Sequence, residues 1–352
     1  MSRRLPGADP QGVAVQGGDA EADARTVHGL AAHVVDFYDR DEDLIASLVD
    51  YVAAGFDAGD AVVVLATAPH RAALETASAG AGIDLRTARA SGAFTMVDAA
   101  DTLAGFMVDG IPQMDPFASV VGDLIRQAAA DGRPVRAFGE MVALLWDEGN
   151  VAAAIDLEAL WDQLATGCQL SLYCAYKMSS LAAHGDLGST NEVCQRHSTV
   201  IAPVSYGSPL PSEPSLADLD ERSQLFVPVP SAIRAVRWFV TETLFAWGEA
   251  ELVNVARIVV SELATNAVRH ADSAFRAEIS RSESQVTISI HDASRLLPKR
   301  RRAASGASGG RGVSLVADLS AEWGAELAPA GKVVWSQLNR SANGRSTQLL
   351  KN

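Results

Sequence analysis

The sequence predicts two α/β domains joined by a linker, on three observations. A chain of 352 residues is long enough for two ordinary domains. Segments of strand and helix character alternate from residue 32 to residue 176, which is typical of a mainly parallel sheet with helices on its faces. A stretch rich in Pro, Ser and Gly then separates this part from a second one, in which helices come before antiparallel strands.

The composition argues against several classes of protein. Hydrophobic residues make up 48% and charged residues 20%, so we expect a mostly globular chain. The formal net charge of −14 argues against nucleic-acid binding, because the phosphate backbone attracts a basic surface. No apolar run approaches the length of a membrane span, and the N-terminus lacks a signal-peptide pattern. We therefore expect a cytoplasmic protein that contacts neither membrane nor nucleic acid.

The three cysteines, Cys168, Cys174 and Cys194, have neither the parity of disulfides nor the spacing of a metal site. Cys168 and Cys174 flank or lie in a predicted buried strand. A free thiol in such a place is typically a small hydrophobic side chain. We expect reduced cysteines in the core.

The first domain is predicted over residues 29–180, after a tail at 1–28 that has no hydrophobic period and is predicted to be disordered. Apolar and β-branched runs predict strands, and periodic apolar positions predict helices. The predicted strands are 32–38, 61–65, 94–97, 135–138 and 169–176. The predicted helices are 41–56, 70–79, 99–108, 117–130, 140–146 and 151–164.

The turn after strand 61–65 indicates what this sheet does not bind. Ligands of parallel sheets bind beyond the carboxyl ends of the strands. A phosphate loop there needs glycines and a Lys-Ser/Thr pair, and Ala66-Thr67-Ala68-Pro69-His70-Arg71 has neither. The first domain is therefore not expected to cradle a triphosphate.

Scattered short motifs in this region carry a resemblance. They are His33 with Phe37-Tyr38, Gly55 with Gly59-Asp60, Phe138-Gly139-Glu140-Met141, and Leu157-Glu158 with Trp161. Together they resemble the MEDS sensory domain, whose fold is similar to the RecA-like α/β fold without its phosphate loop. The resemblance implies sensing of a signal or ligand. It makes four residues candidates to line a sensory pocket: His33, Tyr38, Glu140 and Trp161.

A structural interpretation of the same four residues stays open. Tyr38 and Trp161 fit equally as core aromatic residues, Glu140 as a cap at a strand end, and His33 as a hydrogen-bonded core histidine.

Residues 181–224 are predicted to be a linker, with a short helix at 192–198. A sensor histidine kinase would need its acceptor histidine here, and His197 is the candidate. No long helical hairpin is predicted around His197, because the stretch runs directly into Pro203.

The second domain is predicted over 225–340, followed by a disordered tail at 341–352. Ser231 is a plausible N-cap for a helix over 232–247. A second helix is predicted over 251–271 and a third over 313–319. The predicted strands are 226–229, 275–280, 286–290, 322–327 and 332–338.

The helix predicted at 251–271 carries two polar residues, Glu262 and Asn266, one turn apart inside its apolar stripe. Such groups cost stability on a buried face unless something pairs with them. A carboxylate can orient or deprotonate a hydroxyl, and an amide oxygen can hold Mg²⁺. The alternative is a solvated edge glutamate and a satisfied core amide. The apolar residues of the stripe are Leu252, Val255, Val259 and Leu263.

Three further features follow this helix in order. Asp292 ends a strand in His291-Asp292-Ala293-Ser294, where it can accept a hydrogen bond from an adenine amine. A basic loop with Lys299-Arg300-Arg301-Arg302 can close over a nucleotide. Gly309-Gly310-Arg311-Gly312 opens a helix, where backbone amides can approach phosphates.

This order resembles the GHKL ATPase family and, within it, the anti-sigma-factor serine/threonine kinases. The motif Ser261-Glu262-Leu263-Ala264-Thr265-Asn266 carries it, with Trp323-Gly324 and Gly331-Lys332-Val333-Val334-Trp335 near the end. The resemblance implies a GHKL-type α/β sandwich with a mixed, largely antiparallel sheet that binds ATP and Mg²⁺.

The resemblance also implies roles for individual residues. Glu262 would be the general base or positioning carboxylate, Asn266 would hold Mg²⁺, and Asp292 would contact the adenine. Gly310 and Gly312 would lie against the phosphates. Arg269 and His270 follow the motif helix and would face the nucleotide or cap the helix.

One position departs from the family pattern, because Ser294 stands where a glycine is usual two residues after the aspartate. A serine at this position can still form the turn, but its side chain narrows the space through which the adenine approaches Asp292. We expect a signalling regulator that phosphorylates an anti-sigma-factor antagonist or sequesters a sigma factor, and the resemblance implies a homodimer. The alternatives are a sigma-binding module with a decayed ATP site and a sensor histidine kinase.

Overall fold

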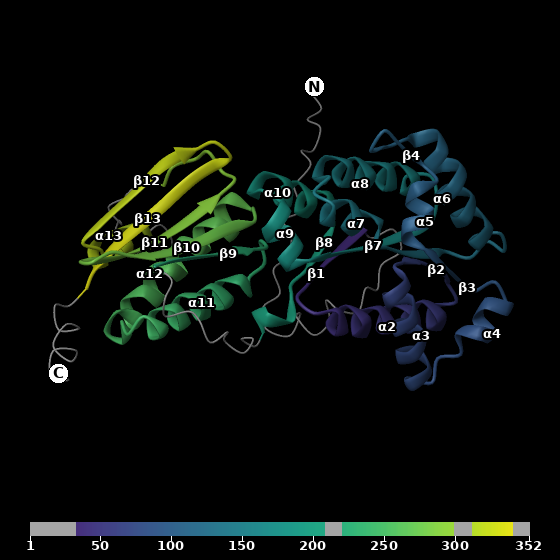
Figure 1. Cartoon of the computed structure of the whole chain (residues 1–352), viewed down its shortest axis with the longest axis horizontal. Helices are drawn as coiled ribbons and strands as arrows, with labels where there is room; N and C mark the ends of the chain where they lie inside the picture. The colour runs from purple at the N-terminus through teal and green to yellow at the C-terminus, as the bar shows by residue number, and fades with distance from the viewer. Residues whose placement is uncertain (1–32, 208–219, 299–311, 341–352) are drawn as a thin grey trace, which may run out of the picture.

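The computed structural model describes residues 33–207, 220–298 and 312–340, so the predicted tails at 1–28 and 341–352 lie outside the described residues. Two α/β units lie side by side along the long axis (Figure 1). In the part of the chain described, no helix is long and apolar enough to cross a membrane.

The first unit is built on a six-stranded sheet in the order β3-β2-β6-β7-β1-β8. Every neighbouring pair in it is parallel, which confirms the predicted parallel sheet. The strands are β1 (His33–Tyr38), β2 (Ala61–Ala66), β3 (Phe94–Asp98), β6 (Val135–Gly139), β7 (Leu170–Lys177) and β8 (Thr199–Ile201).

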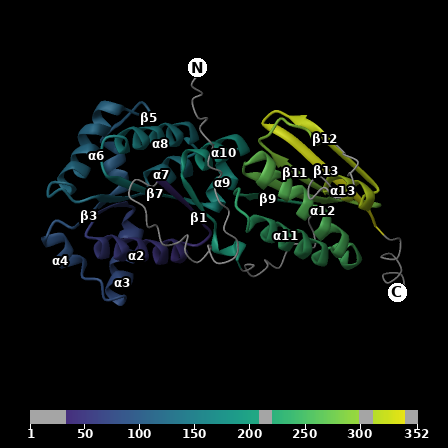
Figure 2. The same cartoon turned by 180° about the vertical axis from the view of Figure 1, so that it is seen from behind.

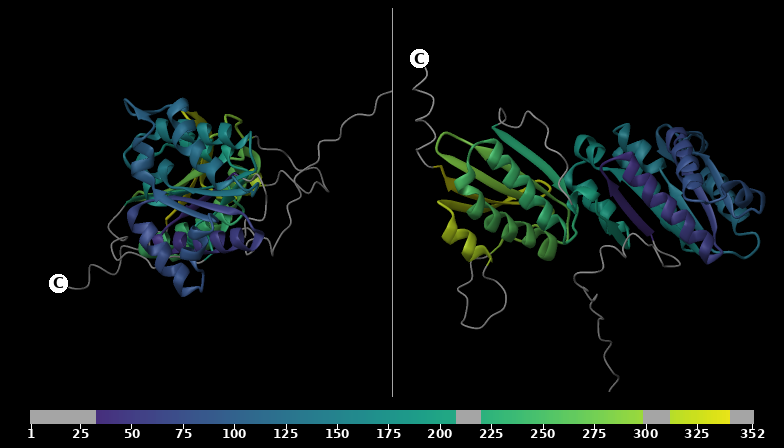
Figure 3. Two further views of the ribbon diagram at one scale, coloured as in Figure 1. Left: turned by 90° about the vertical axis from the view of Figure 1, so that its right-hand side faces the viewer. Right: turned by 90° about the horizontal axis from the view of Figure 1, so that it is seen from below.

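Helices cover both faces of this sheet (Figures 1 and 3). Alternate residues of β2 point into separate cores, with Val62 and Val64 on one face and Val63 and Leu65 on the other. One face carries α2 (Asp41–Ala58), α3 (Ala68–Gly80) and α4 (Leu85–Ala90). The other carries α5 (Ala99–Ala104), α6 (Met114–Ala128), α7 (Met141–Asp147) and α8 (Val151–Ala165).

The helix predicted over 99–108 is wrong at its C-terminal end. The chain leaves α5 at Ala104 and forms a small antiparallel hairpin from β4 (Met107–Val108) and β5 (Ile111–Pro112). Asp109 and Gly110 both have positive φ, at 51° and 78°. An Asp-Gly pair with two positive φ angles forms the tight turn that a two-residue hairpin needs, and this overrides the helical pattern.

Much of the segment predicted as a linker is structured instead. It holds α9 (Met178–His184), α10 (Leu187–Arg196), β8 and the 3₁₀ turn η1 (Val204–Tyr206). Asp186 caps α10 by accepting the Ser189 N–H at 2.7 Å, and β8 pairs with β1 at the edge of the sheet. Residues 208–219 of the predicted linker lie outside the described residues, and its last residues, 221–224, already belong to a strand of the second unit.

The second unit is a two-layer sandwich, seen from behind in Figure 2. Its five-stranded sheet has the order β12-β13-β11-β10-β9, and every neighbouring pair is antiparallel. The strands are β9 (Glu221–Phe226), β10 (Phe275–Arg281), β11 (Gln285–Asp292), β12 (Glu322–Ala328) and β13 (Gly331–Asn339). The helices are α11 (Ala232–Ala246), α12 (Val253–Asn266) and α13 (Gly312–Leu319).

Tyr206 joins the two units across the undescribed stretch. Its hydroxyl oxygen accepts the backbone N–H of Val227 at 3.0 Å, and its ring centroid lies 5.7 Å from that of Phe226. Arg234 Nε donates to the Tyr206 carbonyl at 3.1 Å. All three contacts are made by buried or partly buried groups, so the end of the first unit is packed onto the second.

Candidate functional site

The helix predicted over 251–271 corresponds to α12, and the residues at each end of the predicted range form another kind of helical turn. A 3₁₀ turn (Ala250–Leu252) precedes it, and a π-helical turn, η4 (Ala267–Ala271), follows Asn266. The chain then leaves at Asp272 with φ 45°.

Glu262 and Asn266 lie at the edge of the buried face of α12, not inside it as the sequence predicted. Both are half-buried. The buried face is rotated because α12 contacts α11 as well as the sheet, and it includes Val253, Ala256, Val260 and Ala264 in addition to Val259 and Leu263.

The amide of Asn266 has no hydrogen-bond partner at its nitrogen within the part of the chain that the structure describes. Its Nδ2 atom is buried and has no hydrogen-bond partner among the described residues. A buried polar group without a partner costs about 1–3 kcal/mol, so a ligand that accepts a hydrogen bond from this nitrogen would be favoured here. Because the amide can turn by 180°, the same side chain can present its oxygen to a cation.

Gly312 brings the start of α13 against Glu262. A Cβ atom built on Gly312 would lie 2.4 Å from Glu262 Oε2, so only glycine allows this approach without moving the carboxylate. Two parts of the predicted site are therefore adjacent although 312 and 262 belong to different helices. Gly310 and the basic loop at 299–302 lie outside the described residues.

Asp292 ends β11 and is 2% exposed, and one of its two carboxylate oxygens is already engaged. Asp292 Oδ1 accepts Lys332 Nζ at 2.7 Å and the Ser294 N–H at 2.9 Å. The two charged residues are direct partners in the β11–β13 register. Lys332 was missing from the predicted site; a lone lysine opening an otherwise mostly apolar strand was the signal for it.

Ser294 turns the chain as a serine is expected to do. Its backbone N–H donates to Asp292, and its hydroxyl accepts the Leu296 N–H at 3.1 Å. Arg269 and His270 both lie on the π turn and are exposed.

In the first unit, Tyr38 ends β1 and Glu140 follows β6, so both lie at the carboxyl end of the sheet. Glu140 Oε2 accepts the Thr67 N–H at 2.6 Å, at the N-terminus of α3, and its other oxygen bonds to His70 Nδ1. The carboxylate thus occupies the position in which a phosphate loop would hold a phosphate. Burial, together with the Glu140 charge, raises the pKa of Tyr38 well above its usual range.

His33 and Trp161 do not join that pair, so the four predicted residues do not line one pocket. His33 starts β1 and Tyr38 ends it, which separates them by about 17 Å. Trp161 is 2% exposed and packs edge to face on Phe117 at 5.4 Å. It is a core aromatic residue, as the structural interpretation expected.

The side chain of His197 is fully buried, with 0% of its area exposed. Burial also lowers its pKa below the usual value. A phosphoryl group cannot reach it without unfolding, so the histidine-kinase alternative loses its acceptor. Of the cysteines, Cys174 and Cys194 are buried as expected, whereas Cys168 is exposed in the turn after α8 and corrects that expectation.

Family models match both units. Residues 32–197 match the MEDS domain, described as the MEthanogen/methylotroph, DcmR Sensory domain. Residues 226–338 match the histidine kinase-like ATPase domain. The chain is a MEDS domain followed by a histidine kinase-like ATPase domain. A search of curated proteins finds no match.

This organisation identifies a signalling protein. The ATPase domain implies ATP binding, usually with Mg²⁺. The unpaired Asn266 amide and the Gly312 approach to Glu262 fit such a ligand. Asp292 fits it too, because Lys332 and Ser294 both bond to Oδ1, and the other carboxylate oxygen can still accept an adenine amine.

Proposed function

We propose that the protein is a regulator of the anti-sigma-factor type. Its MEDS domain responds to a signal, and its ATPase domain uses ATP·Mg²⁺ to phosphorylate a Ser or Thr of an anti-sigma-factor antagonist, or sequesters a sigma factor as a homodimer. The observation that carries this proposal is the approach of Gly312 to Glu262, with the unpaired Asn266 amide one turn further along α12.

The chemistry asked of these residues is modest. Phosphoryl transfer needs alignment, a cation on the phosphate oxygens and a group that positions the attacking hydroxyl. Glu262 is half-buried and sits beside the start of α13, where it can accept the proton of a bound hydroxyl. Asn266 can offer its amide oxygen to Mg²⁺, which when bound neutralises charge developing on the phosphates.

A second candidate function is favoured by one observation. Lys332 already pairs with Asp292, the residue expected to recognise the adenine. If the lysine at this strand end also keeps an adenine away from the other carboxylate oxygen, the ATPase domain keeps its fold for capture of a sigma factor and no longer transfers phosphate.

The experiment uses the full chain. Titration with ATP and Mg²⁺ compares the wild type with Asn266→Ala, Glu262→Gln and a control, Glu251→Gln, an exposed glutamate just before the same helix. Transfer from γ-labelled ATP to a candidate antagonist is then measured. We expect Asn266→Ala to lose Mg²⁺-dependent binding. Glu262→Gln should bind ATP and lose transfer by about 10²–10⁴-fold.

The two candidates give opposite results. Absence of transfer by the wild type, with sigma-factor binding unchanged in Glu262→Gln, supports the binding module. Equal ATP affinity in the wild type and Asn266→Ala would mean that Asn266 does not hold the bound cation, and unchanged transfer in Glu262→Gln would mean that Glu262 does not position the hydroxyl.

A further inference from the structure

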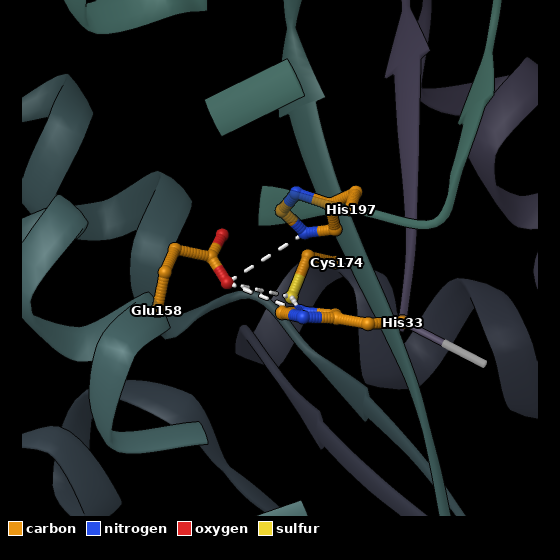
Figure 4. Close-up of side chains that lie close together, drawn as sticks. All are labelled: His33, Glu158, Cys174 and His197. Atoms are coloured by element: carbon orange, nitrogen blue, oxygen red, sulfur yellow. Dashed lines mark hydrogen bonds and ion pairs between the residues drawn. The ribbon is translucent and has the colours of Figure 1, made fainter. Parts of the chain in front are cut away.

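Four side chains from four separate elements converge inside the MEDS domain (Figure 4). His33 comes from β1, Glu158 from α8, Cys174 from β7, and His197 from the end of α10. One donor atom of each lies within 4.8 Å of the other three. All are buried except His33, which is half-buried. None of them belongs to the nucleotide site or to the Tyr38–Glu140 end of the sheet.

Four of the six separations between these donor atoms match the edges of a tetrahedron around a metal ion. Zn²⁺ binds N at about 2.0–2.1 Å, O at about 2.0–2.2 Å and S at about 2.3 Å, which sets neighbouring ligand atoms about 3.3–3.7 Å apart. Glu158 Oε2 lies 3.3 Å from His33 Nε2, 3.4 Å from Cys174 Sγ and 3.6 Å from His197 Nε2. His33 Nε2 lies 3.5 Å from Cys174 Sγ.

Each candidate ligand except the Cys174 thiol forms a hydrogen bond to a second group through the atom that points away from the centre. His33 Nδ1 contacts Asp162 Oδ1 at 2.8 Å, and His197 Nδ1 donates to the Val193 carbonyl at 2.6 Å. Glu158 Oε1 accepts the Tyr176 hydroxyl at 2.7 Å. These bonds leave the two Nε2 atoms and Oε2 to face the centre. Metal-binding histidines and carboxylates are typically oriented by such outer partners.

The hydrogen bonding of the His197 ring indicates which kind of ion the cluster can bind. Its Nδ1 faces a carbonyl, which only accepts, so Nδ1 carries the proton and the Nε2 of a neutral ring carries a lone pair. That Nε2 atom is buried and has no hydrogen-bond partner among the described residues. Glu158 Oε2 lies 3.6 Å from it and is an acceptor as well. A cation between the two resolves the conflict.

We propose that His33, Glu158, Cys174 and His197 bind one transition-metal ion of the zinc class. Two imidazoles, a thiolate and a carboxylate suit Zn²⁺, whereas Mg²⁺ and Ca²⁺ prefer oxygen ligands alone. With four protein ligands the site is closed, as structural zinc sites are. It fastens β1, β7, α8 and the end of α10 together.

The first measurement is metal content. The untagged full chain is supplied with Zn²⁺, dialysed and analysed by elemental mass spectrometry, beside Cys174→Ser and the control Cys194→Ser, whose buried thiol lies outside the cluster. We expect about one zinc per chain in the wild type and in Cys194→Ser, and a loss of the metal in Cys174→Ser. Wild type that retains no more zinc than Cys174→Ser would overturn the proposal.

A second variant tests the site without removing any of its four ligands, so the test does not depend on whether Cys174→Ser folds. Asp162→Asn keeps all four ligands and changes a side chain that is 40% exposed, so the fold should tolerate it. Losing an outer carboxylate typically weakens metal binding about 10–100-fold, and we expect that loss for zinc, measured by competition with a chelator. Co²⁺ should give the thiolate charge-transfer band of a tetrahedral site in wild type. Unchanged zinc affinity in Asp162→Asn, or a cobalt spectrum without that band, would contradict this geometry.

Discussion

Lys332 Nζ lies 2.7 Å from Asp292 Oδ1, and the two residues are 5% and 2% exposed. They face each other across β11 and β13, at the strand end expected to recognise a nucleobase. A buried charge pair is costly to form but more costly to break, because the remaining charge is left without a partner. The lysine is therefore a fixed part of the site.

Removing one member of this pair should destabilise the ATPase domain strongly. We expect Lys332→Met to lower the free energy of unfolding by about 3–5 kcal/mol, because it leaves Asp292 buried and unpaired. Urea denaturation followed by fluorescence measures the change. The double variant Asp292→Leu/Lys332→Met should recover most of the loss, since no charge remains buried. A cost below about 1 kcal/mol for the single variant would mean that the pair is solvated.

Gly331 should tolerate no side chain. Its φ is +152°, and a Cβ atom would lie 1.9 Å from the Asp292 carbonyl oxygen and 2.7 Å from Ala293 Cα. Because both obstacles are backbone atoms, Gly331→Ala must separate β13 from the end of β11. We expect a loss of more than about 3 kcal/mol, measured by thermal unfolding.

Gly248 provides the matched control for that substitution. It also has positive φ, at +77°, but a Cβ would meet nothing within 4 Å. Gly248→Ala should cost only about 1 kcal/mol, from the left-handed backbone alone. Similar losses in the two variants would show that the close approach at Gly331 has no energetic role.

Gly312→Ala should alter the nucleotide site and leave the fold intact. The obstacle to its Cβ is Glu262 Oε2, the far end of a flexible side chain, so the carboxylate can move aside. Displacing a positioned catalytic group by about 1 Å typically costs about 10²-fold in rate. We expect phosphate transfer to fall by that order with an unchanged melting temperature.

The control for this change is Gly80→Ala, at the end of α3, where a Cβ would meet nothing within 4 Å. It should change neither property. Full activity in Gly312→Ala would mean that the position of Glu262 does not matter for transfer.

His70 should make the stability of the MEDS domain depend on pH. Its hydrogen bond to Glu140 raises its pKa above the ordinary value, despite partial burial. The folded state therefore holds this proton more tightly than the unfolded chain does. The resulting stabilisation is complete below about pH 6.5 and is lost as the pH rises through the folded pKa.

Urea denaturation at pH 5.5 and pH 9 checks this expectation by comparing wild type with His70→Gln. The difference in unfolding free energy between the two proteins should be larger at pH 5.5. A difference that grows towards pH 9 would reverse the sign of the linkage and contradict the His70–Glu140 bond.

Most of the fold could be predicted from the sequence, because its strongest signals are local. The continuous apolar run of β2 indicated a strand buried on both faces, and the apolar period of α2 placed its helix within two residues. The hairpin at 107–112 was missed because two residues with positive φ decide it. Most of the structure between residues 181 and 207 was missed because its short elements gain stability from contacts with β1 and α8.

From the sequence, only those site residues that belong to one local motif could be placed together. Glu262 and Asn266 share a helix turn, so spacing alone placed them together. Lys332 reaches Asp292 through strand pairing across 40 residues, and His33 reaches Cys174 across 141. Contacts of this kind depend on sheet order and register, which local patterns do not encode.

The contact between Tyr206 and Val227 also sets where this protein can be divided. A fragment that begins at residue 220 would leave the buried Val227 N–H without its acceptor, at a cost of about 1–3 kcal/mol, and would uncover one side of the Phe226 ring. A fragment that begins before Pro203 would retain both contacts and should melt at a higher temperature. Residues at the end of the first unit therefore supply part of the packing that stabilises the ATPase domain, and separating the two units would destabilise that domain.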